Sequence, residues 1–179
     1  MKVIDLSVPL FTGMPVYPGD PEVKIEQIHS LAKEGWRLRM LHIPSHIGAH
    51  VDAFSHMNEK GLTLDKIPLT RFFGETEIVK VGGTYPHGKG LMFVEGKMVL
   101  GEVKRIIKAK PNFVAVGADC EFSVEVEREL LTQGVVTITD LVNTDKLPRN
   151  KSFMFYALPL NIKDGDGSPV RAVAMVEMA

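Results

Sequence analysis

The clearest hydrophobic pattern lies in the middle of the chain, where short apolar runs alternate with amphipathic segments. The apolar runs predict buried strands, at residues 91–95, 113–117 and 135–139. Between them, residues 98–109 place apolar side chains at helical spacing, and a second helix is predicted from the N-cap Ser123 to the stop at Gly134. This order predicts a βαβαβ unit with parallel strands and right-handed crossovers.

Both flanks of this unit carry segments whose apolar and polar positions alternate, or whose apolar runs are short. They predict further strands, at residues 2–6, 23–28, 36–43, 75–81, 153–158 and 170–175. Because these flanking strands look antiparallel, we expect a mixed α+β domain in which an antiparallel sheet accompanies the parallel unit. A length of 179 residues fits a single domain that spans residues 1–179.

Composition narrows the classes of function. The hydrophobic fraction of 45% and the charged fraction of 24% are ordinary for a globular protein, and the net charge of −1 implies no basic surface for nucleic acid or acidic membranes. No apolar run has the length of a transmembrane helix, and the first residues lack the apolar stretch of a signal peptide. A single cysteine, Cys120, suits a reducing cytoplasm.

The most informative polar segment is residues 46–56, which holds three of the six histidines. His46, His50 and Asp52 offer two imidazoles and a carboxylate, a ligand set suited to a divalent metal. Zinc is the first expectation, with manganese or iron as alternatives. His56 follows closely and could move protons. The competing interpretation is a turn with unrelated polar residues.

The spacing of these residues requires a bend in the backbone. On a helix His46 and His50 would share a face, but Asp52 would point elsewhere. On a straight strand all three share a face, yet His46 would lie roughly 13 Å from His50 at about 3.3 Å per residue, too far for one ion. Gly48 permits a bend, so we predict a metal-binding loop that leaves a strand.

Two further residues near this loop have a structural and a functional interpretation. Tyr17 lies in a stiff stretch rich in proline and glycine, which is either a surface turn or the wall of a binding pocket. His42 has the same parity as Leu38 and Met40 in the predicted strand 36–43, so we expect a buried, hydrogen-bonded histidine there and not a ligand.

The histidine segment resembles the pattern His-x-Gly-Thr-His-x-Asp-x-Pro-x-His of the cyclase-like metal-dependent hydrolases, which include bacterial kynurenine formamidase and isatin hydrolase. Ala49 and Phe54 depart from that pattern. Supporting matches occur in the same order as in the family, at Asp5-Leu-Ser, Tyr17-Pro-Gly-Asp, Gly117-Ala-Asp119, Ala157-Leu-Pro-Leu160 and Gly167-Ser-Pro-Val-Arg171.

The resemblance implies a swivelling β/β/α fold and a homodimer or homotetramer. It implies metal binding by His46, His50 and Asp52, His56 as the catalytic acid/base, and an aromatic side chain, here Tyr17, against the substrate. Many relatives hold a second ion with a histidine and a glutamate, whose places are taken here by Glu127 or Arg128 and by Thr139. We therefore expect one ion per chain, and we expect Glu127 to interact with its helix dipole.

Two classes of function follow. The first is a metal-dependent hydrolase of a small substrate, either a linear amide of the formamide type or a cyclic amide, with water as nucleophile and His56 as general acid/base. The second is a catalytically degraded relative that binds a small molecule or a metal. The near-complete histidine motif favours the enzyme, and the replaced second-site ligands motivate the alternative.

Overall fold

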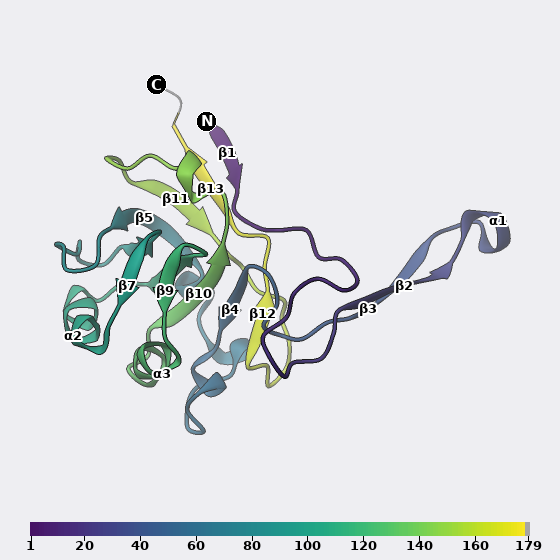
Figure 1. Cartoon of the computed structure of the whole chain (residues 1–179), viewed down its shortest axis with the longest axis horizontal. Helices are drawn as coiled ribbons and strands as arrows, with labels where there is room; N and C mark the ends of the chain where they lie inside the picture. Colours follow the sequence, from purple (N-terminus) through teal and green to yellow (C-terminus); the bar gives the residue numbers. More distant parts are fainter. Residues whose placement is uncertain (178–179) are drawn as a thin grey trace.

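The computed structural model describes residues 1–177, whose largest element is a nine-stranded mixed sheet with the order β1-β13-β11-β5-β6-β8-β10-β4-β12 (Figure 1). Its centre is parallel. The central strands are β5 (Phe73–Val79), β6 (Gly90–Phe93), β8 (Phe113–Gly117) and β10 (Val136–Leu141). The predicted βαβαβ unit is thereby confirmed.

Antiparallel strands complete the sheet on both sides of this centre. One side has β11 (Phe153–Tyr156), β13 (Val173–Val176) and β1 (Lys2–Asp5), and the other has β4 (His50–Asp52) and β12 (Gly167–Pro169). The mixed α+β class is therefore confirmed. The predicted strand 170–175 is wrong at its start, because residues 167–169 pair with β4 and a separate strand begins at Val173.

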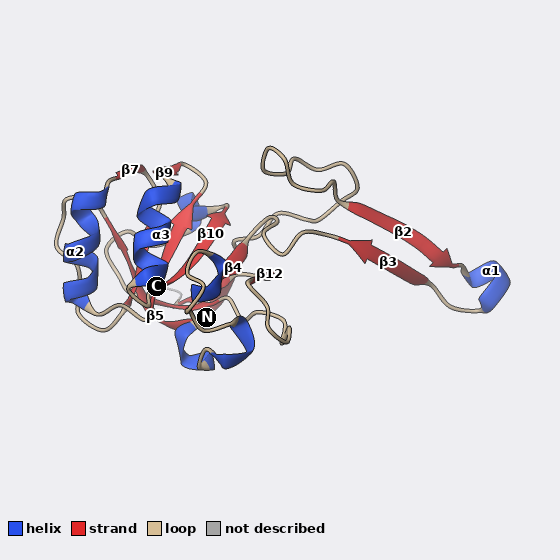
Figure 2. Cartoon of the chain, turned by 90° about the horizontal axis from the view of Figure 1, so that it is seen from below, coloured by secondary structure: helices blue, strands red, loops and turns tan. Residues whose placement is uncertain are grey.

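Two helices cover one face of the sheet, α2 (Leu100–Ala109) and α3 (Val124–Thr132) (Figure 2). Ser123 caps α3, since its side chain accepts a hydrogen bond from the Val126 amide. Successive side chains of β6 point to opposite faces of the sheet, so the core has two parts. Leu91 and Phe93 pack under the helices, whereas Met92 belongs to the cluster on the opposite face. The helices and strands thus form one layered body.

Several short elements complete the fold. Two strands, β7 (Gly96–Met98) and β9 (Cys120–Phe122), form a small parallel pair at one end of the sheet. Four 3₁₀ turns lie in the connections, at Phe54–His56, Leu64–Lys66, Leu69–Arg71 and Thr144–Lys146. Over the described part of the chain, no helix combines the length and apolar character that crossing a membrane requires.

A separate two-stranded antiparallel sheet forms an arm that leaves the body (Figure 1). The arm consists of β2 (Lys24–His29), the short helix α1 (Leu31–Glu34) and β3 (Leu38–His42). The predicted strands 23–28 and 36–43 are confirmed in substance. The expected burial of His42 is wrong, because 57% of its side chain is exposed and it faces Glu26 at 3.3 Å on the free surface of the arm.

Candidate metal centre and active site

The histidine segment leaves the arm, bends and enters the main sheet. Gly48 has φ +57°, a left-handed conformation that a β-carbon disfavours, and a β-carbon there would lie 3.1 Å from Leu10 Cδ2. After this bend, His50 and Asp52 lie in β4, which β10 and β12 pair on both sides. The predicted bend at Gly48 is therefore present.

Three predicted ligand residues converge at this place. One donor atom each of His46, His50 and Asp52 lies within 4.8 Å of the others. Oδ1 of Asp52 is 2.7 Å from Nδ1 of His46 and 3.5 Å from Nε2 of His50. Asp52 is 1% exposed, so its charge is held in a region that water reaches poorly. Their assignment as metal ligands stays a prediction.

The hydrogen bonds of His50 fix its tautomer. Nδ1 lies 2.7 Å from the Gly48 carbonyl oxygen, which can only accept, so Nδ1 carries the proton. The lone pair of Nε2 then faces the site, and Nε2 accepts a hydrogen bond from the Thr139 hydroxyl at 3.1 Å. A histidine oriented through its other nitrogen in this way is typical of metal ligands.

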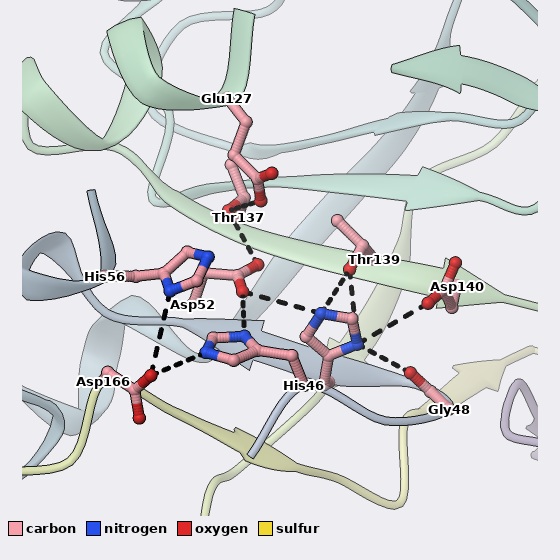
Figure 3. A network of polar contacts seen from close by, with 10 residues as sticks. His46, Gly48, Asp52, His56, Glu127, Thr137, Thr139, Asp140 and Asp166 are labelled. Carbon is pink, nitrogen blue, oxygen red and sulfur yellow. Dashed lines mark hydrogen bonds and ion pairs between the residues drawn. The ribbon is translucent and has the colours of Figure 1, made fainter. Parts of the chain in front are cut away.

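His46 lies between two carboxylates. Its Nδ1 faces Asp52, and its Nε2 is 2.9 Å from Oδ2 of Asp166, as Figure 3 shows. Burial alone lowers the pKa of His46, but the hydrogen bond and charge of Asp52, helped by Asp166, outweigh it and raise the pKa to about 9. Without a metal, His46 therefore carries the positive charge that balances Asp52.

His56 lies beside this pair. Its ring centroid is 3.9 Å from that of His46, and its Nδ1 is 3.8 Å from Oδ2 of Asp166 (Figure 3). Burial, followed by the positive charge of His46, lowers the pKa of His56. A second possible ligand group thus consists of His46, His56 and Asp166.

Glu127 also reaches the site, which corrects the expectation that it serves only its helix dipole. The Thr137 hydroxyl lies 3.0 Å from Oδ2 of Asp52 and 3.1 Å from Oε1 of Glu127. The Thr137 hydroxyl has one proton and can donate it to only one of the two carboxylates. Both contacts are hydrogen bonds when Glu127 is protonated and donates to the Thr137 oxygen. Burial, then the charge of Asp52, raises the pKa of Glu127 to about 8.

A bulge in β10 brings a further carboxylate towards His50. The pairing of β10 with β8 shifts between Ile138 and Leu141, and Asp140 has φ +58°. Oδ2 of Asp140 consequently lies 3.7 Å from Nδ1 of His50. In a regular strand, the side chains of Thr139 and Asp140 would point to opposite faces of the sheet. The bulge interrupts that alternation.

A cavity of about 740 Å³ opens over these groups. Its lining includes Tyr17, Pro18, Val116, Cys120 and Phe122. Tyr17 itself is 67% exposed, so its ring borders the cavity without being packed. The structure thus places the Tyr17 loop at the wall of a pocket; contact with a substrate stays a prediction.

Comparison with protein families settles the relationship of this chain. The Cyclase family profile matches residues 4–146. The chain belongs to the Cyclase family. Among its curated relatives, the kynurenine formamidase of Maricaulis maris is 31% identical, with 96% of this chain and 97% of the relative covered. The kynurenine formamidase of Salinibacter ruber is 27% identical, with 97% of each chain covered.

Solved structures show the same cyclase-family fold. Isatin hydrolase A from Labrenzia aggregata superposes with a TM-score of 0.83 at 20% identity, covering 99% of this chain and 94% of the other. A potential metal-dependent hydrolase with cyclase activity gives a TM-score of 0.78 at 20% identity and covers 99% of each chain. The expected resemblance and fold are therefore confirmed.

Sequence reasoning missed Asp166 in this cyclase-family site and assigned Glu127 to its helix dipole. Asp166 lies 120 positions from His46, and no ligand spacing connects them. Glu127 carried a usable signal, because it precedes the buried Leu130 and Leu131 by three and four residues and so shares their helix face. An acidic residue on the buried face of a helix is expected to have a partner inside.

Proposed function

We propose that this protein is a metal-dependent hydrolase of a small amide, either a linear formamide or a cyclic amide. The observation that carries the proposal is the convergence of His46, His50 and Asp52 at the floor of the cavity. The kynurenine formamidase relatives and the isatin hydrolase fold support amide hydrolysis as the reaction.

The donor set of the site fits one divalent cation. Nε2 of His50 already offers a lone pair, and Asp52 supplies a buried negative charge. Asp140 and Asp166 add negative carboxylates around the same point, whereas none of the described residues that line the cavity is Lys or Arg. A cation bound by His46, His50 and Asp52 would replace the proton of His46 and offset this excess of negative charge.

A bound divalent ion would supply Lewis acidity towards the amide carbonyl and towards water. His56 would remove a proton from the attacking water while the new carbon–oxygen bond forms. As the carbon–nitrogen bond breaks, His56 returns that proton to the leaving nitrogen. Asp166 holds the rings of His46 and His56 in place from the same side.

The cavity lining also restricts the substrate. The described lining residues include no Lys or Arg, and the charge of His46 is balanced by Asp52, so the other carboxylates of the cavity repel an anionic substrate group. Apolar side chains of Val116, Phe122 and Val124 suit a ring or short hydrocarbon. We therefore propose a neutral or cationic substrate with an apolar part.

The test combines metal analysis with hydrolysis. Elemental analysis of purified protein is expected to find one divalent ion per chain, zinc first among the candidates. Hydrolysis of a panel of formanilides, isatin and small lactams is then measured before and after chelation, and again after zinc, manganese or iron is restored. Metal-loaded protein that hydrolyses none of the panel would favour a binding protein over an enzyme.

A further inference from the structure

Two threonines of β10 face two of the candidate metal ligands in β4. In the antiparallel register of these strands, Thr137 lies opposite Asp52 and Thr139 lies opposite His50. Side chains two positions apart on a strand point to the same face of the sheet, so both threonines are directed towards the ligands. The pairing of the strands thus gives each of these two ligands a hydroxyl group of its own.

The Thr137 hydroxyl bonds the oxygen of Asp52 that lies away from the histidines. Oδ1 of Asp52 is the oxygen that faces His46 and His50, at 2.7 Å and 3.5 Å. Oδ2 lies 3.0 Å from Oγ1 of Thr137 (Figure 3). Both Thr137 and Asp52 are buried, and breaking a hydrogen bond between buried groups is costly because water does not replace the lost partner. The carboxylate of Asp52 is therefore held in one orientation.

Glu127 determines the direction of the Thr137 hydroxyl. Its Oε1 lies 3.1 Å from the same hydroxyl oxygen, and burial favours the neutral form of this glutamate. A protonated Glu127 donates to the oxygen of Thr137, which leaves the single hydroxyl proton of Thr137 for Asp52. The contacts form a short chain that leads from α3 through β10 to the ligand in β4.

The Thr139 hydroxyl has a different relation to its ligand. It lies 3.1 Å from Nε2 of His50, the nitrogen whose lone pair faces the site. A cation bound by His50 would take this lone pair, and the hydrogen bond from Thr139 would be lost. Thr137, in contrast, bonds an oxygen of Asp52 that such a cation leaves free. Of the two threonines, only Thr137 therefore supports a bound cation.

We propose, on the basis of the metal site proposed above, that Thr137 is the positioning residue that keeps Asp52 a monodentate ligand. With Oδ2 bonded to Thr137, only Oδ1 is presented to a cation together with the donor atoms of His46 and His50. A monodentate carboxylate leaves room for water or a substrate oxygen among the ligands, as catalytic zinc sites require. The loss of a group that orients a metal ligand typically lowers metal affinity about 10–100-fold.

The test is a calorimetric titration of zinc into the chelated full-length chain. It compares the unmodified protein with Thr137→Val and Thr137→Ser. Valine has nearly the shape of threonine and lacks the hydroxyl, whereas serine keeps the hydroxyl. Zinc affinity is expected to fall about 10–100-fold in Thr137→Val and to return close to that of the unmodified protein in Thr137→Ser.

Two other threonines provide the comparisons. Thr76→Val is the matched control, because Thr76 is equally buried in the same sheet and its hydroxyl bonds the Gly74 carbonyl oxygen. This variant should bind zinc like the unmodified protein. Thr139→Val removes a hydroxyl that a cation displaces, so it should bind zinc at least as tightly as the unmodified protein. A loss of affinity in Thr139→Val as large as that in Thr137→Val overturns the proposal.

Cobalt gives a readout that depends on neither affinity nor activity. Four-coordinate Co²⁺ absorbs visible light more strongly than Co²⁺ with more ligands. In Thr137→Val, Oδ2 of Asp52 is free to turn towards the ion and add a ligand, so the visible bands should weaken, and Thr137→Ser should restore them. An unchanged zinc affinity with an unchanged cobalt spectrum in Thr137→Val overturns the role of Thr137 and leaves the metal site intact. An unmodified chain that binds no zinc overturns both.

Discussion

Nε2 of His46 lies 2.9 Å from Oδ2 of Asp166, although the two residues are 120 positions apart. The pairing of β12 with β4 produces this contact, since Gly167 is in register with Asp52 and Asp166 directly precedes it. The orientation of a candidate metal ligand thus depends on a distant strand. A substitution next to Asp166 is therefore expected to affect His46.

Gly167→Ala should disturb both His46 and the backbone of β4 beside it. A β-carbon at this position would lie 2.4 Å from Cε1 of His46 and 2.8 Å from the Val51 carbonyl oxygen. His46 must therefore move, and we expect metal affinity to fall by about 10–100-fold, as when a ligand loses its orienting partner. Zinc titration monitored by calorimetry measures the change.

Gly101→Ala is the control for that experiment. A β-carbon at Gly101 meets nothing within 4 Å, and alanine favours the helix in which the residue lies. Its metal affinity should equal that of the unmodified protein, and its stability should rise by up to about 1 kcal/mol. Equal zinc affinity in both variants would contradict the role given to the close approach at Gly167.

His56→Ala should keep the metal and lose most of the activity. His56 borders the cavity beside His46, and the loss of a general acid/base costs typically about 10²–10⁴-fold in turnover. Metal content by elemental analysis and turnover on the best substrate are measured together. His87→Ala, at an exposed turn position, serves as the control. Loss of the ion would instead assign His56 as a ligand.

Thr139→Glu should raise the metal content from one towards two ions per chain. The Thr139 hydroxyl lies 3.1 Å from Nε2 of His50, so a carboxylate introduced there would enter the same group of donors and bring the charge that a hydroxyl lacks. Thr84→Glu, at an exposed loop position, controls for added charge. Two ions in the unmodified protein would show that Glu127, Asp140 or Asp166 already completes a second site.

Arg171→Ala should destabilise the protein near neutral pH and not at strongly acidic pH. The guanidinium of Arg171 bonds both oxygens of Asp5 and lowers its pKa below 3.8. Because the pKa of Asp5 is lower in the folded than in the unfolded protein, the ion pair stabilises the fold at pH values above the unfolded-state pKa. That stabilisation is lost as the pH falls through the folded-state pKa. Thermal melts across this range should therefore converge at low pH. A constant difference would mean that packing, not the ion pair, is lost.

The control for the pH experiment is Arg149→Ala. Arg149 is exposed, and no ion pair of this residue is seen among residues 1–177. Its melting temperature should follow that of the unmodified protein at every pH. The comparison separates the specific pairing of Arg171 with Asp5 from the general loss of one positive charge.

The sequence by itself determined the local elements and the ligand types. Alternating and helical periodicities predicted the βαβαβ unit, because side-chain burial in these elements repeats at short range. The spacing of His46, His50 and Asp52 predicted a bend at Gly48, because one ion cannot span an extended strand. Both arguments need only neighbouring residues.

Tertiary structure alone decided what surrounds those groups. Asp166 reaches His46 through strand pairing, and Asp140 turns towards His50 at a bulge; neither the pairing nor the bulge has a local signal. The exposure of His42 is a further case, since parity shows which residues share a face of a strand but not whether that face is covered. Burial depends on what other segments pack against, and those segments lie far away in the chain.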